Sequence, residues 1–573
     1  DITNFVDSLL IQPDSDGSAP TTGTLSSASD NIGIGKDVFT DLTSGTKNVA
    51  IGTNALKTGT TAEKNVAVGY NSMAAYVKGD KNVAVGMHSL WGSTGDDNTA
   101  VGYYAHQNAS GASQCIAIGS LSLYSNTSGV NTGVGFGAMQ YTTTGTVNTT
   151  LGHQTLFNNT TGGYNTVSGY KALYANTTGS YNAGSGYYAL NANTTASGNT
   201  AFGSNTLEVN TTGAENTAVG YYALRLNLTG GNNVAVGRGS LYANTASSNT
   251  AVGTDSLGAN TSGDKNTALG YHSAVSCVDG GENVAIGYQA LDALTTHSYN
   301  TAVGSQALST VTTAHGNTAV GHKALTAKTT AGTCTAVGAS AGLVVTTADT
   351  GTFIGEYAGG KVTTGNHNIH IGYKAGYTTG PTTGQGCILI GNYSDASATG
   401  SGHQLCLGYD VTGSADSTFT FGNSTTDTTC SFGSTSWSNP SDERIKEDIT
   451  TSTAGLSFIN DLRPVTFKYR QQKDIPDTLR AHKPDEEVDG VNEGLVRYRN
   501  DYVNHGFIAQ EVKTVIDNHS EIEDGFDMWA TDERDGRQRI GDSALVPMLV
   551  KAIQELSTQN EALSARILTL ENA

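Results

Sequence analysis

The sequence predicts a mainly β protein: a long parallel β-roll or β-helix stalk of repeats, then a small α+β domain that ends in a coiled coil. A short motif of the form N-x-A-V-G recurs from Gly35 to Gly422, mostly at spacings of 17 residues. Residues 441–573 hold 42 of the 80 charged side chains, which marks a change of domain. Leucines and isoleucines at heptad spacing close the chain.

Composition excludes several classes of protein. The chain has 573 residues, 14% of them charged, with 72 glycines against eight prolines and a formal net charge of −20. It is too apolar and too regular for disorder, and it lacks the Gly-X-Y period of collagen. An acidic chain is repelled by nucleic acid and by anionic membranes, so we expect neither as a partner. No stretch of about 20 apolar residues exists, so we expect no membrane insertion.

The six cysteines are far apart and form no CxxC pair. This argues against a zinc site and against a disulfide framework, and it fits synthesis in a reducing cytosol. We expect no cofactor. The chain begins at Asp1 rather than Met and shows no signal peptide, so an upstream part is expected to be missing.

Each repeat reads approximately N-T-A-V-G-Y-Y-A-L-x-A-N-T-T-G-x-x. We interpret it as a short strand ending at the glycine, a second short β run such as YYAL, and a turn rich in Asn, Thr and Gly. Such a unit buries a face only when copies stack, each strand pairing with the same strand one coil above. This predicts a lead-in or attachment segment over residues 1–30, the stalk over 31–430 and a linker over 431–440.

Two positions of the repeat are candidate core positions. Three places after the glycine stands a small residue, and two places before it stands mostly alanine. The last coils exchange sizes: large residues replace that alanine, while the Ala-Leu pair after the glycine becomes Ala-Gly. The large residues are Phe353, His370, Leu389 and Cys406, and the pairs are Ala341-Gly342, Ala358-Gly359 and Ala375-Gly376. We interpret this exchange as conserved core volume with a reshaped cross-section.

These repeats resemble the left-handed β-roll of trimeric autotransporter adhesin heads over residues 31–422, although the period here is longer. The resemblance implies three parallel chains. On a threefold axis, three copies of His370 could bind a metal or an anion, because imidazole is a common ligand; a packed core histidine is the alternative. The tyrosines that follow the repeat glycine fit either a sugar-stacking surface or strand packing.

The charged domain has its own elements. GLSFINDLRPVTFKYR predicts a helix followed by a strand, and HGFIAQEVKTVI predicts a strand or turn leading into a helix. A heptad seam follows in the predicted coiled coil of about residues 545–573, with a single Asn that can fix register. Its members are Leu549, Ile553, Leu556, Asn560, Leu563, Ile567 and Leu570.

Four motifs in order resemble the intramolecular chaperone auto-processing domain that ends phage tail fibres, tail spikes and endosialidases. They are SDERIKEDI, LRPVTFKY, GFIAQEV and LVPMLVKAIQEL, and the resemblance covers residues 437–573. It implies a domain over 441–573 that chaperones a trimer and cuts itself off with a catalytic Ser441–Lys446 dyad at the Pro440–Ser441 bond. Arg444, His505 and Glu511 are possible supporting residues; a solvated charged turn is the alternative interpretation of the dyad segment.

The chemistry is intelligible from the residues. A serine hydroxyl attacks only when a base takes its proton, and lysine is such a base only when burial or nearby cations lower its pKa. Ser441 is placed to attack the carbonyl of residue 440 in a single-turnover autoproteolysis. A pair five residues apart does not share a helix face, so the dyad must meet through a turn or between chains.

The sequence therefore predicts a homotrimeric tail fibre or receptor-binding protein of a phage or phage-like particle. Expected partners are its own copies, other tail or baseplate proteins, and a host cell-surface glycan or protein receptor. The expected location is the virion tail, extracellular after assembly in the host cytoplasm. A polysaccharide-degrading tail spike and a cell-surface trimeric adhesin are the alternatives; the former needs paired carboxylates, and the repeats are poor in acids.

Overall fold

The computed structural model describes residues 8–11, 28–75, 78–330, 332–434, 446, 449–479, 481–485, 495–520, 522, 528–531, 537–541 and 545–572. The chain divides into two compact units, Asp1–Pro440 and Ser441–Ala573. Among the described residues, no helix is both long and apolar enough to cross a bilayer.

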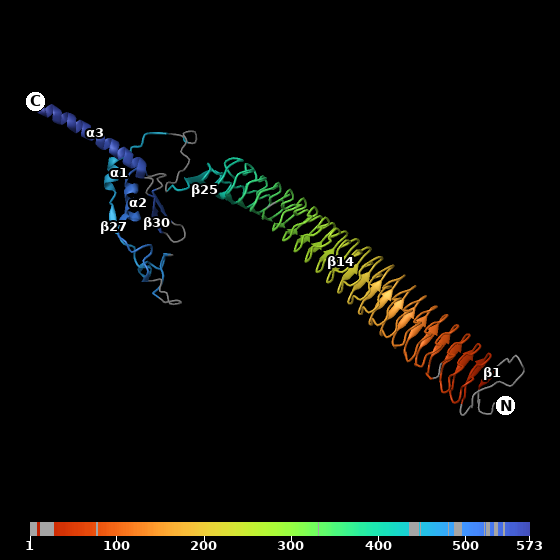
Figure 1. Cartoon of the computed structure of the whole chain (residues 1–573). Helices are drawn as coiled ribbons and strands as arrows, with labels where there is room; N and C mark the ends of the chain where they lie inside the picture. The colour runs from red at the N-terminus through yellow and green to blue at the C-terminus, as the bar shows by residue number, and fades with distance from the viewer. Residues whose placement is uncertain are drawn as a thin grey trace. The chain divides into compact units, whose positions relative to one another are not determined.

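The first unit is a parallel β-solenoid in which each coil contributes one short strand (Figure 1). The strands are β1 (Leu9–Ile11), β2 (Ile32–Ile34), β3 (Val49–Ile51), β4 (Val66–Val68), β5 (Val83–Val85), β6 (Thr99–Val101), β7 (Ile116–Ile118), β8 (Thr132–Val134), β9 (Thr149–Leu151), β10 (Thr166–Ser168), β11 (Ala183–Ser185), β12 (Thr200–Phe202), β13 (Thr217–Val219), β14 (Val234–Val236), β15 (Thr250–Val252), β16 (Thr267–Leu269), β17 (Val284–Ile286), β18 (Thr301–Val303), β19 (Thr318–Val320), β20 (Thr335–Val337), β21 (Thr352–Ile354), β22 (Ile369–Ile371), β23 (Ile388–Ile390), β24 (Leu405–Tyr409), β25 (Thr418–Asn423) and β26 (Thr426–Ser431).

Successive coils stack in register, with equivalent residues opposite one another. Ala218 of β13 lies opposite Ala235 of β14, for example, and both side chains are buried. The parallel ladder runs to β25, where β26 turns back and pairs antiparallel with it. The ladder therefore ends in an antiparallel hairpin instead of a further parallel coil.

The predicted second β run is wrong. From Gly35 to Gly372 the residues after each repeat glycine form turns, and the non-glycine residues two and four places on have left-handed backbones, such as Tyr222 (φ 63°) and Leu224 (φ 50°). Their N–H groups bond neighbouring coils in opposite directions: Tyr222 N donates to Ser204 O (3.2 Å) and Leu224 N to Ser240 O (3.0 Å). The residues after the glycine therefore form hydrogen bonds with the coils on both sides, as a strand does, although their backbone is not extended.

The repeat glycine is required by close approach between coils. Gly220 has φ 126°, and a Cβ added there would lie 2.7 Å from the carbonyl oxygen of Gly237 in the next coil. No side chain fits at that distance and conformation. This explains why the glycine recurs in every unit.

The exchange of core sizes in the last coils is confirmed. The ring of Phe353 fills the space over Gly359, where an added Cβ would lie 2.1 Å from Phe353 Cδ1. In the next coil His370 fills the space over Gly376, with Nδ1 2.3 Å from the corresponding Cβ position. The small side chain at one position is matched by a large one across the core.

A ladder of buried asparagines runs beside the strands. Asn233 donates its backbone N–H (3.0 Å) and its Nδ2 (3.1 Å) to Asn216 Oδ1, and Nδ2 also donates to Ala246 O (2.9 Å). The same pattern recurs in coil after coil, for example between Asn165 and Asn148. Each amide thus satisfies backbone groups that the turns would leave buried and unpaired. These asparagines are the first residue of the N-x-A-V-G motif, and the ladder was not predicted from the sequence.

The second unit is α+β in its described residues. Its elements are α1 (Leu456–Asp461), β27 (Val465–Phe467), η2 (Gln472–Asp474), β28 (Asn504–Gly506), α2 (Ala509–Asn518), β29 (Trp529–Thr531), β30 (Gln538–Ile540) and α3 (Leu545–Glu571). β27 pairs antiparallel with β28, and β29 with β30. Phe458, Val512, Ile516 and Met528 form its core. The predicted strand-to-helix transition in HGFIAQEVKTVI is confirmed.

Candidate autoprocessing site and assembly surfaces

The structure leaves the predicted dyad untested. Pro440, Ser441 and Arg444 lie outside the described residues, so the cleavage bond and the nucleophile stay predictions. Lys446 is described, and its side chain is exposed in the single chain. A lysine that serves as a general base must first lose its proton, which burial favours.

Glu511, in the first turn of α2, forms an ion pair with Arg463, which precedes β27. Arg463 Nε donates to Glu511 Oε2 at 2.9 Å, and Arg463 Nη2 contacts the other carboxylate oxygen. The hydrogen bond from Arg463 lowers the pKa of Glu511. Sequence reasoning missed Arg463, although it stands in the LRPVTFKY motif. The pair joins two of the family-like motifs, 48 residues apart.

His505 lies on β28, opposite Thr466 of β27, with its side chain exposed. It immediately precedes the turn into α2. A supporting role in catalysis stays a prediction, because Ser441 is not described.

The position of His370 argues against the predicted metal site. Its side chain is fully buried within its own chain, edge-on to Phe353 with ring centroids 5.6 Å apart. Neither ring nitrogen has a hydrogen-bond partner, and burial lowers the pKa of His370 to about 3. Among the described residues no three His, Cys, Asp or Glu side chains gather to hold a metal. A ring enclosed by its own coil cannot meet copies of itself on a shared axis.

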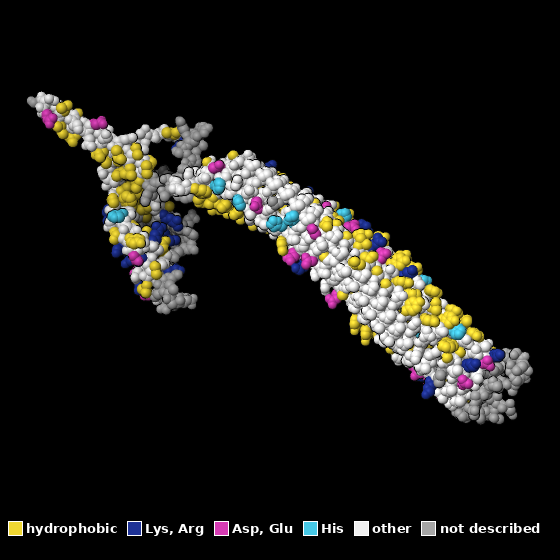
Figure 2. Space-filling view, in the orientation of Figure 1, with side chains coloured by type: hydrophobic (Ala, Val, Ile, Leu, Met, Phe, Trp, Pro, Cys, Tyr) yellow, Lys and Arg dark blue, Asp and Glu magenta, His cyan; other side chains and the backbone are white. Residues whose placement is uncertain are grey.

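The strands present an uncharged outer face along the shaft. In each strand from β2 to β23 the middle residue is buried in the core, and the two flanking side chains point outward and are partly exposed. None of those flanking residues is charged; nearly all are Val, Ile, Leu or Thr. We call this surface the strand face. Figure 2 shows hydrophobic side chains in rows on a shaft that carries few charges.

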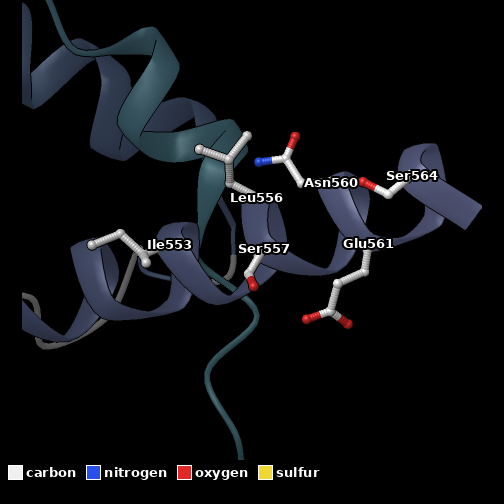
Figure 3. A pocket seen from close by; sticks show the side chains of 6 residues that line it. All are labelled: Ile553, Leu556, Ser557, Asn560, Glu561 and Ser564. Atoms are coloured by element: carbon white, nitrogen blue, oxygen red, sulfur yellow. The ribbon is translucent and has the colours of Figure 1, made fainter.

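A second apolar surface lies on α3. Leu545 and Ala552 are buried against the core of the unit, whereas the seam residues from Leu549 onward are exposed: Leu549 (42%), Ile553 (66%), Leu556 (47%), Leu563 (55%), Ile567 (47%) and Leu570 (70%). Ile553, Leu556, Ser557, Asn560, Glu561 and Ser564 line a concavity of about 520 Å³. Figure 3 shows Leu556 and Asn560 projecting from one side of α3, and Ser557 and Glu561 from the other.

The comparisons agree with this second unit. Residues 441–521 match the family model described as chaperone of endosialidase. Neither the curated proteins nor the solved structures contain a match. A domain of this type at the C-terminal end, combined with a long parallel β-solenoid, fits a tail fibre or tail spike.

Proposed function

We propose that this chain is the subunit of a homotrimeric tail fibre of a phage or phage-like particle. Its C-terminal domain chaperones assembly of the shaft and then cleaves itself away before Ser441. The shaft is proposed to reach the host surface and bind a receptor there. The observation that carries the proposal is the uncharged strand face of a solenoid attached to an endosialidase-type chaperone domain.

The strand face favours a second copy of this chain as its partner. A partner that covers it along the whole shaft must repeat at the spacing of stacked coils, about 4.8 Å. A copy in parallel register does so by construction, while an unrelated globular protein would contact only a few coils. Exposed apolar surface that continues over this length is a feature of protein interfaces rather than of free monomers.

The proposal of three copies rests on the resemblance to trimeric families. Along α3, Ile553, Asn560 and Ile567 occupy one set of heptad positions and leucines the other. This pattern, taken alone, favours two strands. The helical seam is three heptads long, whereas the strand face extends over the whole shaft. The shaft is therefore expected to determine the number of copies, and α3 to bring the C-termini together.

Assembly before cleavage follows from the physics of the shaft. Within one chain each coil stacks on its neighbour in sequence. Bringing three chains into register, by contrast, costs the translational and rotational freedom of each chain before contacts between chains form. A domain that holds three C-termini together reduces that entropic cost. Its removal then leaves a shaft whose disassembly is slow, since its nucleating partner is gone.

In the proposed cleavage, Ser441 Oγ attacks the carbonyl carbon of Pro440. Lys446 takes the hydroxyl proton and returns it to the departing amide nitrogen of Ser441. The resulting ester between Pro440 and Ser441 Oγ is hydrolysed by water, which completes one turnover. Because Lys446 is exposed in the single chain, contacts made on assembly are proposed to bury it and so couple cleavage to folding.

Denaturing electrophoresis and intact mass of the wild type and of Ser441→Ala test this function. The wild type is expected to give two fragments, residues 1–440 and 441–573, and Ser441→Ala a single chain of 59.1 kDa. Lys446→Met should also stay uncut. Ser452→Ala, an exposed serine in the same unit, is the matched control and should cleave normally. An intact wild-type chain in assembled fibres would exclude autoproteolysis.

A further inference from the structure

Aromatic side chains next to the repeat glycines form two kinds of row along the shaft. In the first, Phe136, His153, Tyr170 and Tyr187 stack face to face at 5.0, 5.2 and 5.4 Å, with interplanar angles of 22° or less. Stacked rings cover one another's faces and expose mainly their edges. This row stabilises coil packing and is poorly suited to stack on a sugar.

The second row is open and lies in the last coils of the shaft. Tyr373 and Tyr393 meet at 5.3 Å and 87°, and Tyr393 and Tyr409 at 6.2 Å and 81°. Edge-to-face contacts leave at least one face of a ring uncovered. Tyr393 is 37% exposed and Tyr409 is 59% exposed. Tyr393 and Tyr409 therefore each keep part of a ring face exposed to solvent.

A lysine lies among these rings. Lys374 Nζ is 5.1 Å from the ring centroid of Tyr373, 5.4 Å from that of Tyr377 and 5.8 Å from that of Tyr393. Lys361 Nζ is 5.6 Å from the Tyr377 ring. We call Lys361, Tyr373, Lys374, Tyr377, Tyr393 and Tyr409 the tyrosine–lysine patch.

The two lysines of the patch are held by aromatic rings. Within the described part of the chain, neither Lys361 nor Lys374 lies within 4.0 Å of a carboxylate oxygen. Glu356 and Asp410 nevertheless lie in coils next to the patch, since Lys374 N donates to Glu356 O and Asp410 N donates to Asn392 O. A hydrogen bond with Tyr373 raises the pKa of Lys374, so its ammonium stays charged at neutral pH.

We propose that the tyrosine–lysine patch binds an acidic polysaccharide. The C–H faces of pyranose rings would stack on Tyr393 and Tyr409, and an anionic group of the sugar would pair with Lys374. Open aromatic faces select flat apolar sugar faces, and the ammonium selects the anion. The rest of this acidic chain repels a polyanion, so binding is confined to the patch. The inference rests on the proposed attachment function and specifies its ligand.

The repeat supplies a matched control. Lys171 stands two places after its repeat glycine, as Lys374 does, with a similar left-handed backbone (φ 51° and 55°). It also lies near two tyrosines, with Nζ 5.6 Å from the Tyr170 ring and 5.2 Å from the Tyr174 ring. Its neighbours, however, belong to stacked rows. Lys171→Gln therefore removes an equivalent charge beside rings that each have at least one face covered by a stacked neighbour.

The test measures binding of the full chain by calorimetry at fixed ionic strength. The probes are polygalacturonate, phosphorylated dextran, unmodified dextran and polyglutamate. Polygalacturonate or phosphorylated dextran should bind, and which of them binds more tightly identifies the anion. Lys374→Gln and Tyr393→Ala should each raise Kd about tenfold, the loss of about 1.4 kcal/mol expected for one charge-assisted contact. Lys171→Gln should change Kd less than about twofold.

Several outcomes would overturn the inference. One is equal binding of dextran and the acidic polysaccharides, and another is binding of polyglutamate as tight as that of the acidic polysaccharides. The third is an equal loss of affinity for the acidic polysaccharide in Lys374→Gln and Lys171→Gln. Unchanged thermal unfolding of the variants shows that their shafts are intact. Oligomeric state and self-cleavage are measured on the same samples, so failure of the assembly function is seen separately from failure of sugar binding.

Discussion

The carboxylate of Glu555, on α3, accepts a hydrogen bond from the backbone N–H of Leu456, the first residue of α1, at 2.8 Å. Gly455 precedes α1 and supplies no side-chain cap, and a Cβ there would lie 2.6 Å from Glu555 Oε2. A residue 99 positions away thus caps this helix and joins the terminal helix to the core of its unit.

Replacing Glu555 by alanine should lower the stability of the second unit by about 1 kcal/mol, the usual cost of a lost helix cap. Denaturant unfolding followed by circular dichroism measures the change. Glu561→Ala, an exposed glutamate on the same helix, should have little effect. Equal losses in the two variants would show that the cap contributes nothing.

The pairing of Phe353 with Gly359 predicts an exchange experiment. Gly359→Leu alone places a side chain into the Phe353 ring and should cost about 1–3 kcal/mol or more. Phe353→Ala alone leaves a cavity and should cost about 3–5 kcal/mol. The double variant reproduces the Ala319 and Leu325 pair of an earlier coil, so it should be more stable than the sum of the single losses predicts. If thermal unfolding shows that the stability losses of the single variants add in the double variant, residues 353 and 359 do not share one core volume.

Buried His370 predicts a loss of stability in acid. Its pKa is about 3 in the folded chain, against about 6.5 when exposed, so the unfolded chain takes up the proton first as pH falls. The contribution of His370 to the free energy of unfolding is complete above about pH 6.5 and is lost progressively as pH falls towards 3. At pH 5 the loss is about 2 kcal/mol.

His370→Leu should remove this pH-dependent loss. The stability of the variant should therefore fall less than that of the wild type between pH 7 and pH 5. His403→Gln, which removes an exposed histidine, is the control and should keep the wild-type slope. Thermal unfolding at both pH values measures the difference. Identical slopes for wild type and His370→Leu would show that the ring is accessible to protons when folded.

A charge on the strand face should prevent association. Val236 flanks the buried Ala235 in β14, and its side chain points outward. Val236→Glu would place a carboxylate in each copy at the same level of the shaft, where desolvation and mutual repulsion oppose contact. Thr178→Glu, on an exposed turn outside the strand face, is the control. Size-exclusion chromatography should show assembly for Thr178→Glu only. Assembly of both variants would show that the interface lies on a surface other than the strand face.

Periodicity predicted the stacked coils, the core positions and the exchange of sizes near Phe353, because small and large residues recur at fixed offsets. It did not predict the turn at Tyr222 and Leu224, since Tyr and Leu have no preference for left-handed backbones; contacts between coils impose them. The asparagine ladder did have a sequence signal, the Asn that begins the N-x-A-V-G motif of most repeats, but the periodicity alone does not show what its side chain bonds.

The site was less predictable. Motif order placed the chaperone domain, which the family match supports. The partner of Glu511 could not be read from sequence, because Arg463 is 48 residues away and a carboxylate has many possible partners in a charged domain. The Ser441–Lys446 dyad stays a prediction.

The native mass of the purified chain in solution tests the central claim most directly. If the strand faces of three copies pack together, the particle formed by Ser441→Ala should have three times the chain mass of 59.1 kDa. The same shaft recovered as single chains of 59.1 kDa, correctly folded and soluble, would contradict the account.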